Sequence, residues 1–326
     1  MRTFTLKGLF VTAIFMLLGC LAIHAADGDL ITKQITIKLE EAGTLPSKIG
    51  DTKKYKITNL KIMGEINGTD LRFIREMAGC DYKGKGTEGK LATLDLSEAK
   101  IVKGGDYYYN YYGCYTLDDV IGNQAFDGCS SLTSLTLPSS VTSIGSSAFS
   151  GCSGLTSLTL PSSVTSIEWS AFSGCSGLTS LTLPSSVTSI GESAFSGCSG
   201  LTSLTLPSSV SSIGESAFSG CSGLSSIYVN WESPLSIDAS TFEDANTGKC
   251  ILYVPKGTYD DYWISNWGIF ENIVEYDPTG IDHITTSGEA KEISRYAADG
   301  QRLEVPAKGL NIVKYSDGCV KKVVVQ

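Results

Sequence analysis

A repeat of 23 residues occupies the middle of the chain and limits what it can fold into. Residues 181–200 read LTLPSSVTSIGESAFSGCSG, and residues 204–223 repeat them with one substitution. Five leucines mark the same place in successive copies, each 23 residues after the one before: Leu132, Leu155, Leu178, Leu201 and Leu224. A fixed period of about 20 to 50 residues is typical of solenoids, in which each unit buries its neighbour's apolar face. The repeat therefore predicts a stack of similar coils.

Each copy contains apolar segments that fit the sides of such a coil. Leu135 and Leu137 alternate with polar residues as in a short strand. Pro138 ends that strand, because proline lacks the N–H that a sheet ladder needs. Val141 and Ile144 then form a second inward-facing segment on the opposite wall. The sequence predicts parallel strands that pair from coil to coil.

The phenylalanine and the cysteine of each copy close the coil. Stacking places every inward side chain over its copy, about 4.8 Å away. We expect one aromatic column made of Phe126, Phe149, Phe172, Phe195 and Phe218. We expect a parallel ladder made of Cys129, Cys152, Cys175, Cys198 and Cys221. Parallel side chains cannot easily adopt the disulfide dihedral, so these cysteines are predicted to be buried free thiols that act as small apolar fillers.

The unit LxxLxLPxxVxxIGxxAFxxCxx resembles the BspA-like, or Treponema-type, leucine-rich repeats of surface proteins of Gram-negative bacteria. The resemblance is close over residues 120–229, and a weaker unit stands at Leu91, Leu94 and Leu96. It implies an α/β leucine-rich-repeat solenoid rich in β structure. It also implies a secreted or cell-surface protein that binds extracellular or host proteins, with neither catalytic activity nor a cofactor in the repeats.

The flanking segments are predicted to cover the two open ends of the solenoid. Residues 27–90 form an N-terminal capping region with a helix, for which Thr69 is the expected N-cap and Gly79 the stop. Residues 91–230 hold the repeats, with an insertion at residues 104–115. Residues 231–277 form a C-terminal capping unit, in which an aromatic amphipathic segment follows a strand.

Residues 278–326 are predicted to form a small β module, with hairpin turns at Asp299-Gly300 and Asp317-Gly318. The end of this module resembles the C-terminal sorting domains of type IX secretion. A β appendage that only follows the repeats is the alternative interpretation.

Residues 1–26 have the features of a secretory signal peptide: Arg2 and Lys7 precede a short apolar run, and small residues follow it. Cleavage after Ala25 or Ala26 predicts a secreted or outer-surface protein with no later membrane span. A lipoprotein box ending at Cys20 is the alternative, and it would anchor the protein through a lipid. Loss of the peptide changes the formal charge from −9 to −11, which disfavours nucleic acid as a partner.

The sequence offers little for catalysis or for metal binding. His283, the one histidine after the signal peptide, stands in a linker-like context, and the acid pairs Asp118-Asp119 and Asp260-Asp261 are typical of solvated loops. No paired Cys and His spacing suggests a zinc site. We expect no enzyme, no metal site and no cofactor. The pairing of Cys80, Cys114, Cys250 and Cys319 stays open, with Cys80–Cys114 as the pair to test.

Two departures from the repeat are the candidate ligand-binding sites. The insertion GGDYYYNYYGCY contains six tyrosines: Tyr107, Tyr108, Tyr109, Tyr111, Tyr112 and Tyr115. Tyrosine gives a large amphipathic contact area at low entropic cost, although the insertion could instead cover the flank of the first coil. Trp169 is the second departure and is expected to be exposed, since other copies have Ser146, Glu192 and Glu215 there.

The outward strand positions Thr133, Ser134 and Thr136 and their copies predict an uncharged hydroxyl face, which is either a binding surface or merely solvated. Three functions follow. The first is adhesion to proteins of a host or a neighbouring cell. The alternatives are a structural spacer of the cell envelope and a glycan-binding module for nutrient capture.

Overall fold

The computed structural model describes residues 29–109, 113–277, 292–297, 302–303, 305, 308–315 and 320–325. Several features named above lie outside these residues: the signal peptide with Cys20, and also Tyr111, Tyr112, His283 and Cys319. No helix within the described ranges is long and apolar enough to cross a lipid bilayer.

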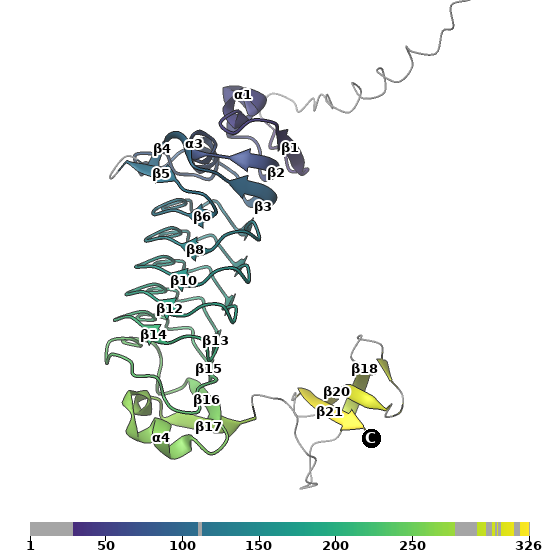
Figure 1. Ribbon diagram of the computed structural model, residues 1–326, viewed down its shortest axis with the longest axis vertical. Helices are drawn as coiled ribbons and strands as arrows, with labels where there is room; N and C mark the ends of the chain where they lie inside the picture. Colours follow the sequence, from purple (N-terminus) through teal and green to yellow (C-terminus); the bar gives the residue numbers. More distant parts are fainter. Residues whose placement is uncertain are drawn as a thin grey trace, which may run out of the picture.

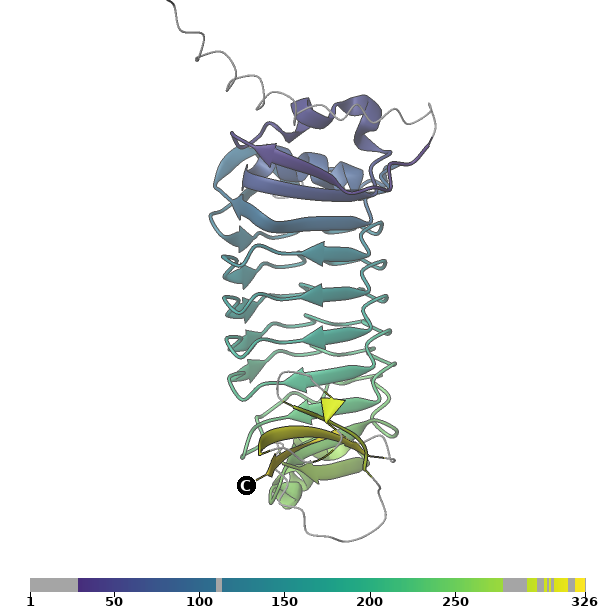
Figure 2. The same ribbon diagram turned by 90° about the vertical axis from the view of Figure 1, so that its right-hand side faces the viewer.

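A ten-stranded parallel sheet runs along the whole stack of coils (Figures 1 and 2). Its order is β1 (Ile35–Leu39), β2 (Asn59–Ile66), β3 (Thr93–Ile101), β7 (Ser134–Thr136), β9 (Ser157–Thr159), β11 (Ser180–Thr182), β13 (Ser203–Leu206), β15 (Ser226–Val229), β16 (Ile251–Pro255) and β17 (Asn272–Tyr276). In the repeats each strand pairs in register with its copy, as Leu158 does with Leu135 and Leu181. The period thus sets both the pairing and the register.

A second, five-stranded parallel sheet forms the opposite wall. It consists of β6 (Val120–Ile121), β8 (Ser143–Ile144), β10 (Ser166–Ile167), β12 (Ser189–Ile190) and β14 (Ser212–Ile213). The isoleucine of each strand points inward and is buried. This wall is the inward-facing segment that the sequence predicts.

The third side is a column of turns with its own backbone ladder. Each phenylalanine N–H donates to a carbonyl of the next coil, as Phe126 does to Ala148 (2.7 Å) and Phe149 to Ala171 (2.7 Å). Gly151 has a φ of 68°, a conformation that residues with a side chain rarely adopt. The glycines of successive turns lie over one another, which brings the backbones close together.

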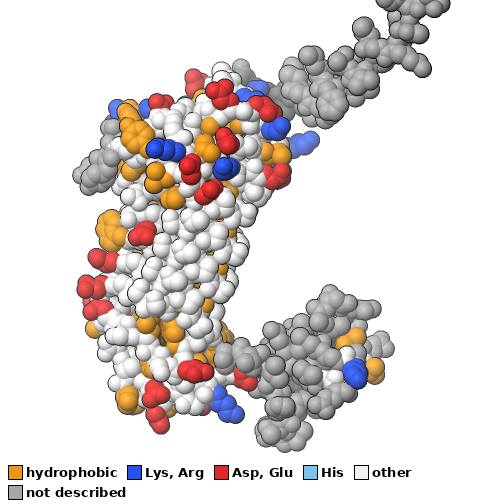
Figure 3. Space-filling view, viewed as in Figure 1, with side chains coloured by type: hydrophobic (Ala, Val, Ile, Leu, Met, Phe, Trp, Pro, Cys, Tyr) orange, Lys and Arg blue, Asp and Glu red, His pale blue; other side chains and the backbone are white. Residues whose placement is uncertain are grey.

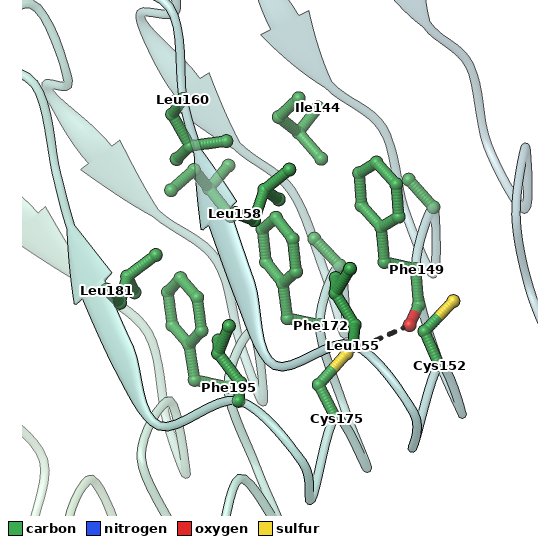
Figure 4. Packing of buried hydrophobic residues seen from close by; sticks show 14 of the residues in the cluster. Ile144, Phe149, Cys152, Leu155, Leu158, Leu160, Phe172, Cys175, Leu181 and Phe195 are labelled. Carbon is green, nitrogen blue, oxygen red and sulfur yellow. Dashed lines mark hydrogen bonds between the residues drawn. The ribbon is translucent and has the colours of Figure 1, made fainter. Parts of the chain in front are cut away.

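The five predicted phenylalanines stack in one column, with ring centroids 5.1–5.4 Å apart and interplanar angles of 1–8°. Figure 4 shows three of them, Phe149, Phe172 and Phe195. The column continues to Phe242, whose ring centroid lies 5.2 Å from that of Phe218. Phe242 then meets Phe270 edge to face and packs against Trp267. The aromatic core therefore runs without a break from the first coil into the C-terminal closing segment.

The ladder cysteines are free and buried, and they do more than fill space. The thiol of Cys175 donates to the Phe149 carbonyl (3.1 Å), as Figure 4 shows, and the thiol of Cys152 donates to the Phe126 carbonyl (3.1 Å). The same Phe126 carbonyl already accepts the Cys129 N–H. Cysteine therefore satisfies the second lone pair of a buried carbonyl, which alanine at this position cannot do.

The N-terminal region contains α1 (Leu45–Ile49), α2 (Asp51–Lys54) and α3 (Gly68–Met77). Leu71, Ile74 and Met77 of α3 are buried together. The expected N-cap was wrong. Asn67 caps α3 by accepting the Thr69 N–H, and the Thr69 hydroxyl instead donates to Asp106 (3.3 Å). Asn67 stands two residues earlier, directly before the helix, where its side-chain oxygen reaches a free backbone N–H, and Thr69 therefore lies inside the first turn.

The tyrosine-rich insertion is a β-hairpin, β4 (Gly104–Tyr109) and β5 (Cys114–Thr116), and β4 packs on α3. At the other end α4 (Tyr259–Ile264) and the 3-10 helix η1 (Asn266–Ile269) close the solenoid. Trp267 is buried there and donates its indole N–H to the Leu235 carbonyl (2.8 Å).

A four-stranded antiparallel sheet follows near the C-terminus, in the order β19 (Arg302–Leu303), β18 (Glu292–Ala297), β20 (Gly309–Tyr315) and β21 (Val320–Val325). In its interior Arg295 donates to the Asn311 side chain (3.1 Å), and both are buried.

Candidate binding surfaces

A partly exposed group of aromatic rings surrounds an arginine at the N-terminal end of the solenoid. Arg72, Tyr82, Tyr107 and Tyr115 form it, and we call it the aromatic patch. The Arg72 guanidinium carbon lies 3.6 Å from the Tyr82 ring centroid and 5.5 Å from that of Tyr107. The rings are 5.9 Å apart for Tyr82 and Tyr107, and 6.3 Å apart for Tyr107 and Tyr115. Three separate segments of the chain therefore meet in this patch.

The hydroxyls of the three patch tyrosines form no hydrogen bond with any described residue, whereas those of two tyrosines at the C-terminal end do. Buried Tyr262 donates to the Trp231 carbonyl (2.9 Å), and half-buried Tyr276 donates to the Val229 carbonyl (3.2 Å). Tyr115 is 55% exposed. Arg72 and Tyr82 also belong to the patch. The sequence interpretation did not select them, because nothing local in the sequence shows that α3 and residue 82 lie against the hairpin.

Tyr108 was a candidate ligand-binding residue, but it is buried, so it is unavailable for ligand contact. Its hydroxyl donates to the Asn123 carbonyl (2.9 Å). Burial raises the pKa of Tyr108. Successive side chains of strand β4 point to opposite faces, so Tyr108 points into the protein while its neighbour Tyr107 points to the aromatic patch.

Arg75 acts beside Tyr108 in covering the first coil. In every later coil, the carbonyls of the turn column accept N–H groups from the coil before. The first coil has no predecessor, and its carbonyls at Asn123, Ala125 and Asp127 are instead bound by Tyr108 (2.9 Å) and by Arg75 (3.1 and 3.0 Å). Arg75 and Tyr108 therefore replace the missing coil.

Arg75→Met is expected to lower the free energy of unfolding by about 2–3 kcal/mol, because it leaves several buried carbonyls without donors. Tyr108→Phe, which leaves one, should cost about 1 kcal/mol. Urea unfolding followed by circular dichroism measures both. Lys53→Met is the matched control on an exposed lysine of the same region. Equal stability of the Arg75 variant and this control would contradict the capping role.

Tyr109 is intermediate between the partly exposed tyrosines of the aromatic patch and buried Tyr108. It is half-buried, and the Arg75 guanidinium carbon is 4.8 Å from its ring centroid. Burial and the nearby Asp127 carboxylate raise the pKa of Tyr109 to about 12. Its ring covers the buried arginine, so its contribution is structural.

Trp169 is 52% exposed, as expected. It occupies the same column of the turn ladder as Ser146, Glu192 and Glu215, two coils from Asn123. At about 4.8 Å a coil, Trp169 lies roughly 10 Å along the solenoid axis from the carbonyl that Tyr108 covers. The tryptophan and the aromatic patch thus occur along one edge of the solenoid, and Figure 1 shows the β4–β5 hairpin above that edge.

The hydroxyl face of the ten-stranded sheet has fewer hydroxyl groups free to bind a ligand than the sequence suggests. The hydroxyls of the first threonine column are used within the solenoid, as Thr156 donates to the Thr133 carbonyl (3.1 Å) and Thr179 to Thr156 (3.2 Å). Thr136 and its copies are exposed. Their column continues into Tyr228 and Tyr253, which stack at 4.4 Å.

Charge is distributed unevenly along the solenoid. Residues 29–109 hold 14 Lys and Arg against 12 Asp and Glu, whereas residues 113–277 hold 2 against 15. Figure 3 shows basic side chains at the N-terminal end, acidic ones along one edge of the coils, and an uncharged face between the two ends. The aromatic patch therefore lies in the one part of the solenoid that is not strongly acidic.

The described residues contain no group of three or more His, Cys, Asp and Glu side chains that could hold a metal ion. Cys80, Cys114 and Cys250 are free. Cys80 donates weakly to the Asp81 carbonyl (3.7 Å), and Cys114 to the Gln124 side chain (3.4 Å), so the pair suggested for a disulfide has separate partners.

Comparison with known proteins identifies the repeats. A family described as "BspA type Leucine rich repeat region" matches residues 119–248 in 6 copies. No curated protein matches the chain. A T. pallidum leucine-rich-repeat protein of known structure is 31% identical over 49% of this chain and 64% of its own, with a TM-score of 0.35.

A leucine-rich-repeat protein from Bacteroides ovatus is 29% identical over 52% of this chain and 44% of its own, with a TM-score of 0.34. The pneumococcal vaccine antigen PcpA is 17% identical over 75% of this chain and 68% of its own, with a TM-score of 0.43. The chain thus spans less than two thirds of the first two relatives. It is a leucine-rich-repeat protein whose residues 119–248 match the BspA-type repeat family.

Proposed function

We propose that this is a secreted or cell-surface adhesion protein that binds other proteins through the aromatic patch. The observation that carries the proposal is the contrast between this patch and the remaining repeat surface. Tyrosine and arginine are enriched where binding energy concentrates at interfaces, and rigid rings lose little entropy on contact. The patch presents three such rings and one guanidinium on a helix, a turn and a hairpin held by the solenoid.

Trp169 extends the proposed surface along the same edge. It is the one tryptophan in the repeats, and it replaces a small or acidic residue of the other copies. The remaining coils present serine, threonine and glutamate on this edge. The proposed interface thus has a centre at the aromatic patch and an outlying contact at Trp169.

Binding of residues 27–326 to an array of matrix proteins, cell-surface proteins and glycans tests the proposal. Changing Tyr82, Tyr107 and Tyr115 to serine is expected to weaken binding to the partner by about thirtyfold or more, in line with the loss of an interface hot spot. Trp169→Ser is expected to have a smaller effect. Affinities are measured by biolayer interferometry on the partner found.

The matched control changes Tyr259 and Trp263 to serine. These rings stack at 6.3 Å and are 40% and 52% exposed at the other end of the solenoid. This variant should bind as the unchanged protein does. If the variant with the patch substitutions still binds and the variant with Tyr259 and Trp263 changed to serine does not, the binding site lies at the C-terminal end. No saturable binding by the folded protein would favour the envelope spacer, and inhibition by free sugar would favour the glycan-binding module.

A further inference from the structure

We infer that the aromatic patch recognises an acidic peptide segment of the partner, with a carboxylate bound by Arg72. This inference rests on the proposed function and adds the chemistry of the ligand. Three observations support it: Arg72 has no carboxylate partner among the described residues, the nearby carboxylates are held by other groups, and the rings are tilted relative to one another.

Arg72 is a half-buried cation that no described carboxylate neutralises. Other cations of the same region are paired: Lys61 with Asp95 (3.3 Å) and Glu98 (2.7 Å), and Lys54 with Glu76 (2.7 Å). The Arg72 guanidinium instead lies against Tyr82, which fixes its plane. An arginine held by aromatic rings keeps its N–H groups available at its edge for a bidentate carboxylate.

The carboxylates near the patch are held by other groups. Asp81 accepts the backbone N–H groups of Lys83 and Lys85 (both 2.8 Å). Asp106 accepts the Thr69 hydroxyl, and Asp127 lies beside Tyr109. These contacts keep the protein's own acids from pairing with Arg72, although the chain has an excess of acids.

Two exposed lysines add positive charge next to the patch. Lys83 lies 5.3 Å from the Tyr82 ring centroid, and Lys85 follows on the same turn. Neither forms an ion pair with a described residue. At physiological salt, acidic side chains more than about 8 Å from the patch are largely screened and repel an acidic ligand only weakly. The cations next to the patch therefore dominate its attraction for a charged ligand.

The rings favour a peptide over a sugar. Tyr82 and Tyr107 are inclined by 57°, and Tyr107 and Tyr115 by 84°, so together they form a set of tilted walls and no flat platform. Tilted walls accept side chains between them, while the three hydroxyls supply further donors. A glutamate- or aspartate-containing segment fits both features, since carboxylates accept hydrogen bonds from guanidinium and hydroxyl groups.

The test measures fluorescence anisotropy of a labelled peptide of alternating glutamate and glycine with residues 27–326. Saturable binding is expected, with at least a tenfold loss in Arg72→Gln, a smaller loss in Arg72→Lys and a further loss in Lys83→Gln. Affinity should fall as salt rises. Lys61→Gln is the matched control, because Lys61 is already paired on the sheet, and it should bind normally. Thermal unfolding by circular dichroism verifies that each variant is folded.

A glutamine-containing peptide of the same length should not bind. Equal binding of both peptides, or of Arg72→Gln and the unchanged protein, would overturn the inference. Binding of heparin but not of the glutamate peptide would replace the acidic peptide with an anionic glycan. If the patch tyrosines are needed for the partner found on the array while Arg72→Gln binds that partner normally, the proposed function stands and this inference fails.

Discussion

Raising the pH from 8 to 10 is expected to lower the free energy of unfolding by about 8 kcal/mol, through four ladder thiols alone. Burial raises the pKa of Cys129 and Cys175 to about 12. Burial also raises the pKa of Cys152, and a hydrogen bond with Cys221 together with burial raises that of Cys198. All four groups stay protonated in the folded protein at pH 10.

The direction follows from the unfolded chain, where a cysteine ionises near pH 8.5. Below that pH both states hold the proton, and the stability does not depend on pH through these groups. Above it the unfolded state loses protons that the folded state keeps, so stability falls as pH rises toward the folded pKa. Each thiol contributes about 2 kcal/mol over this interval.

Urea unfolding at pH 8 and pH 10, in the presence of a reductant, measures the loss. A variant with alanine at Cys129, Cys152, Cys175 and Cys198 is the control, and its pH dependence should be much weaker. Thiol titration with a chromogenic disulfide at pH 8 should label the ladder only after unfolding. Equal stability at the two pH values, or rapid labelling of the folded protein, would contradict a buried, protonated ladder.

The repeats were predictable because translation by one unit reproduces every contact. Once Phe149 points inward, its copies at 23-residue intervals must lie above and below it, and the stacked rings follow. The same argument fails at the ends of the solenoid. Phe242 stands 24 residues after Phe218, so a strict period does not select it. The extra residue lies between Val229, which still pairs with Leu206 at the usual interval, and Phe242, and the stack continues.

The capping residues could not be predicted because their role is defined by unpaired carbonyls. Arg75 and Tyr108 bind carbonyls of the first coil from about 15 to 52 residues away in the chain. Nothing in the local sequence distinguishes Arg75 from Arg72, although one is buried in the cap and the other lies in the aromatic patch. Only the position of α3 over the first coil separates them.

The candidate site was predictable in part. The tyrosine-rich insertion and Trp169 could be selected because each interrupts a regular pattern, and the structure places Tyr107 and Tyr115 in the aromatic patch and exposes Trp169. Within the insertion, strand alternation was the signal that separates buried Tyr108 from Tyr107. The sequence interpretation assigned no strand to the insertion, so it could not use alternation to make that distinction.

Phe172→Ala is expected to destabilise the protein by about 3–5 kcal/mol, the usual cost of removing a buried aromatic ring. Phe172 is fully buried and lies between two partners, with ring centroids 5.1 Å from Phe149 and 5.1 Å from Phe195. The coils are held by parallel ladders at fixed spacing, so the neighbouring rings cannot move together to fill the gap. The full cavity cost is therefore expected.

The solenoid geometry adds a second expectation for the same variant. Each coil contacts only its neighbours, so weakening one interface in the middle of the stack should uncouple the coils on either side. Urea unfolding of Phe172→Ala should then show two transitions where the unchanged protein shows one. Thr182→Ala, on the exposed face two coils' length from either cap, is the control and should change stability by no more than about 0.5 kcal/mol. A loss well under 1 kcal/mol in Phe172→Ala would mean that the aromatic column does not hold the coils together, and that the backbone ladders carry the stack alone.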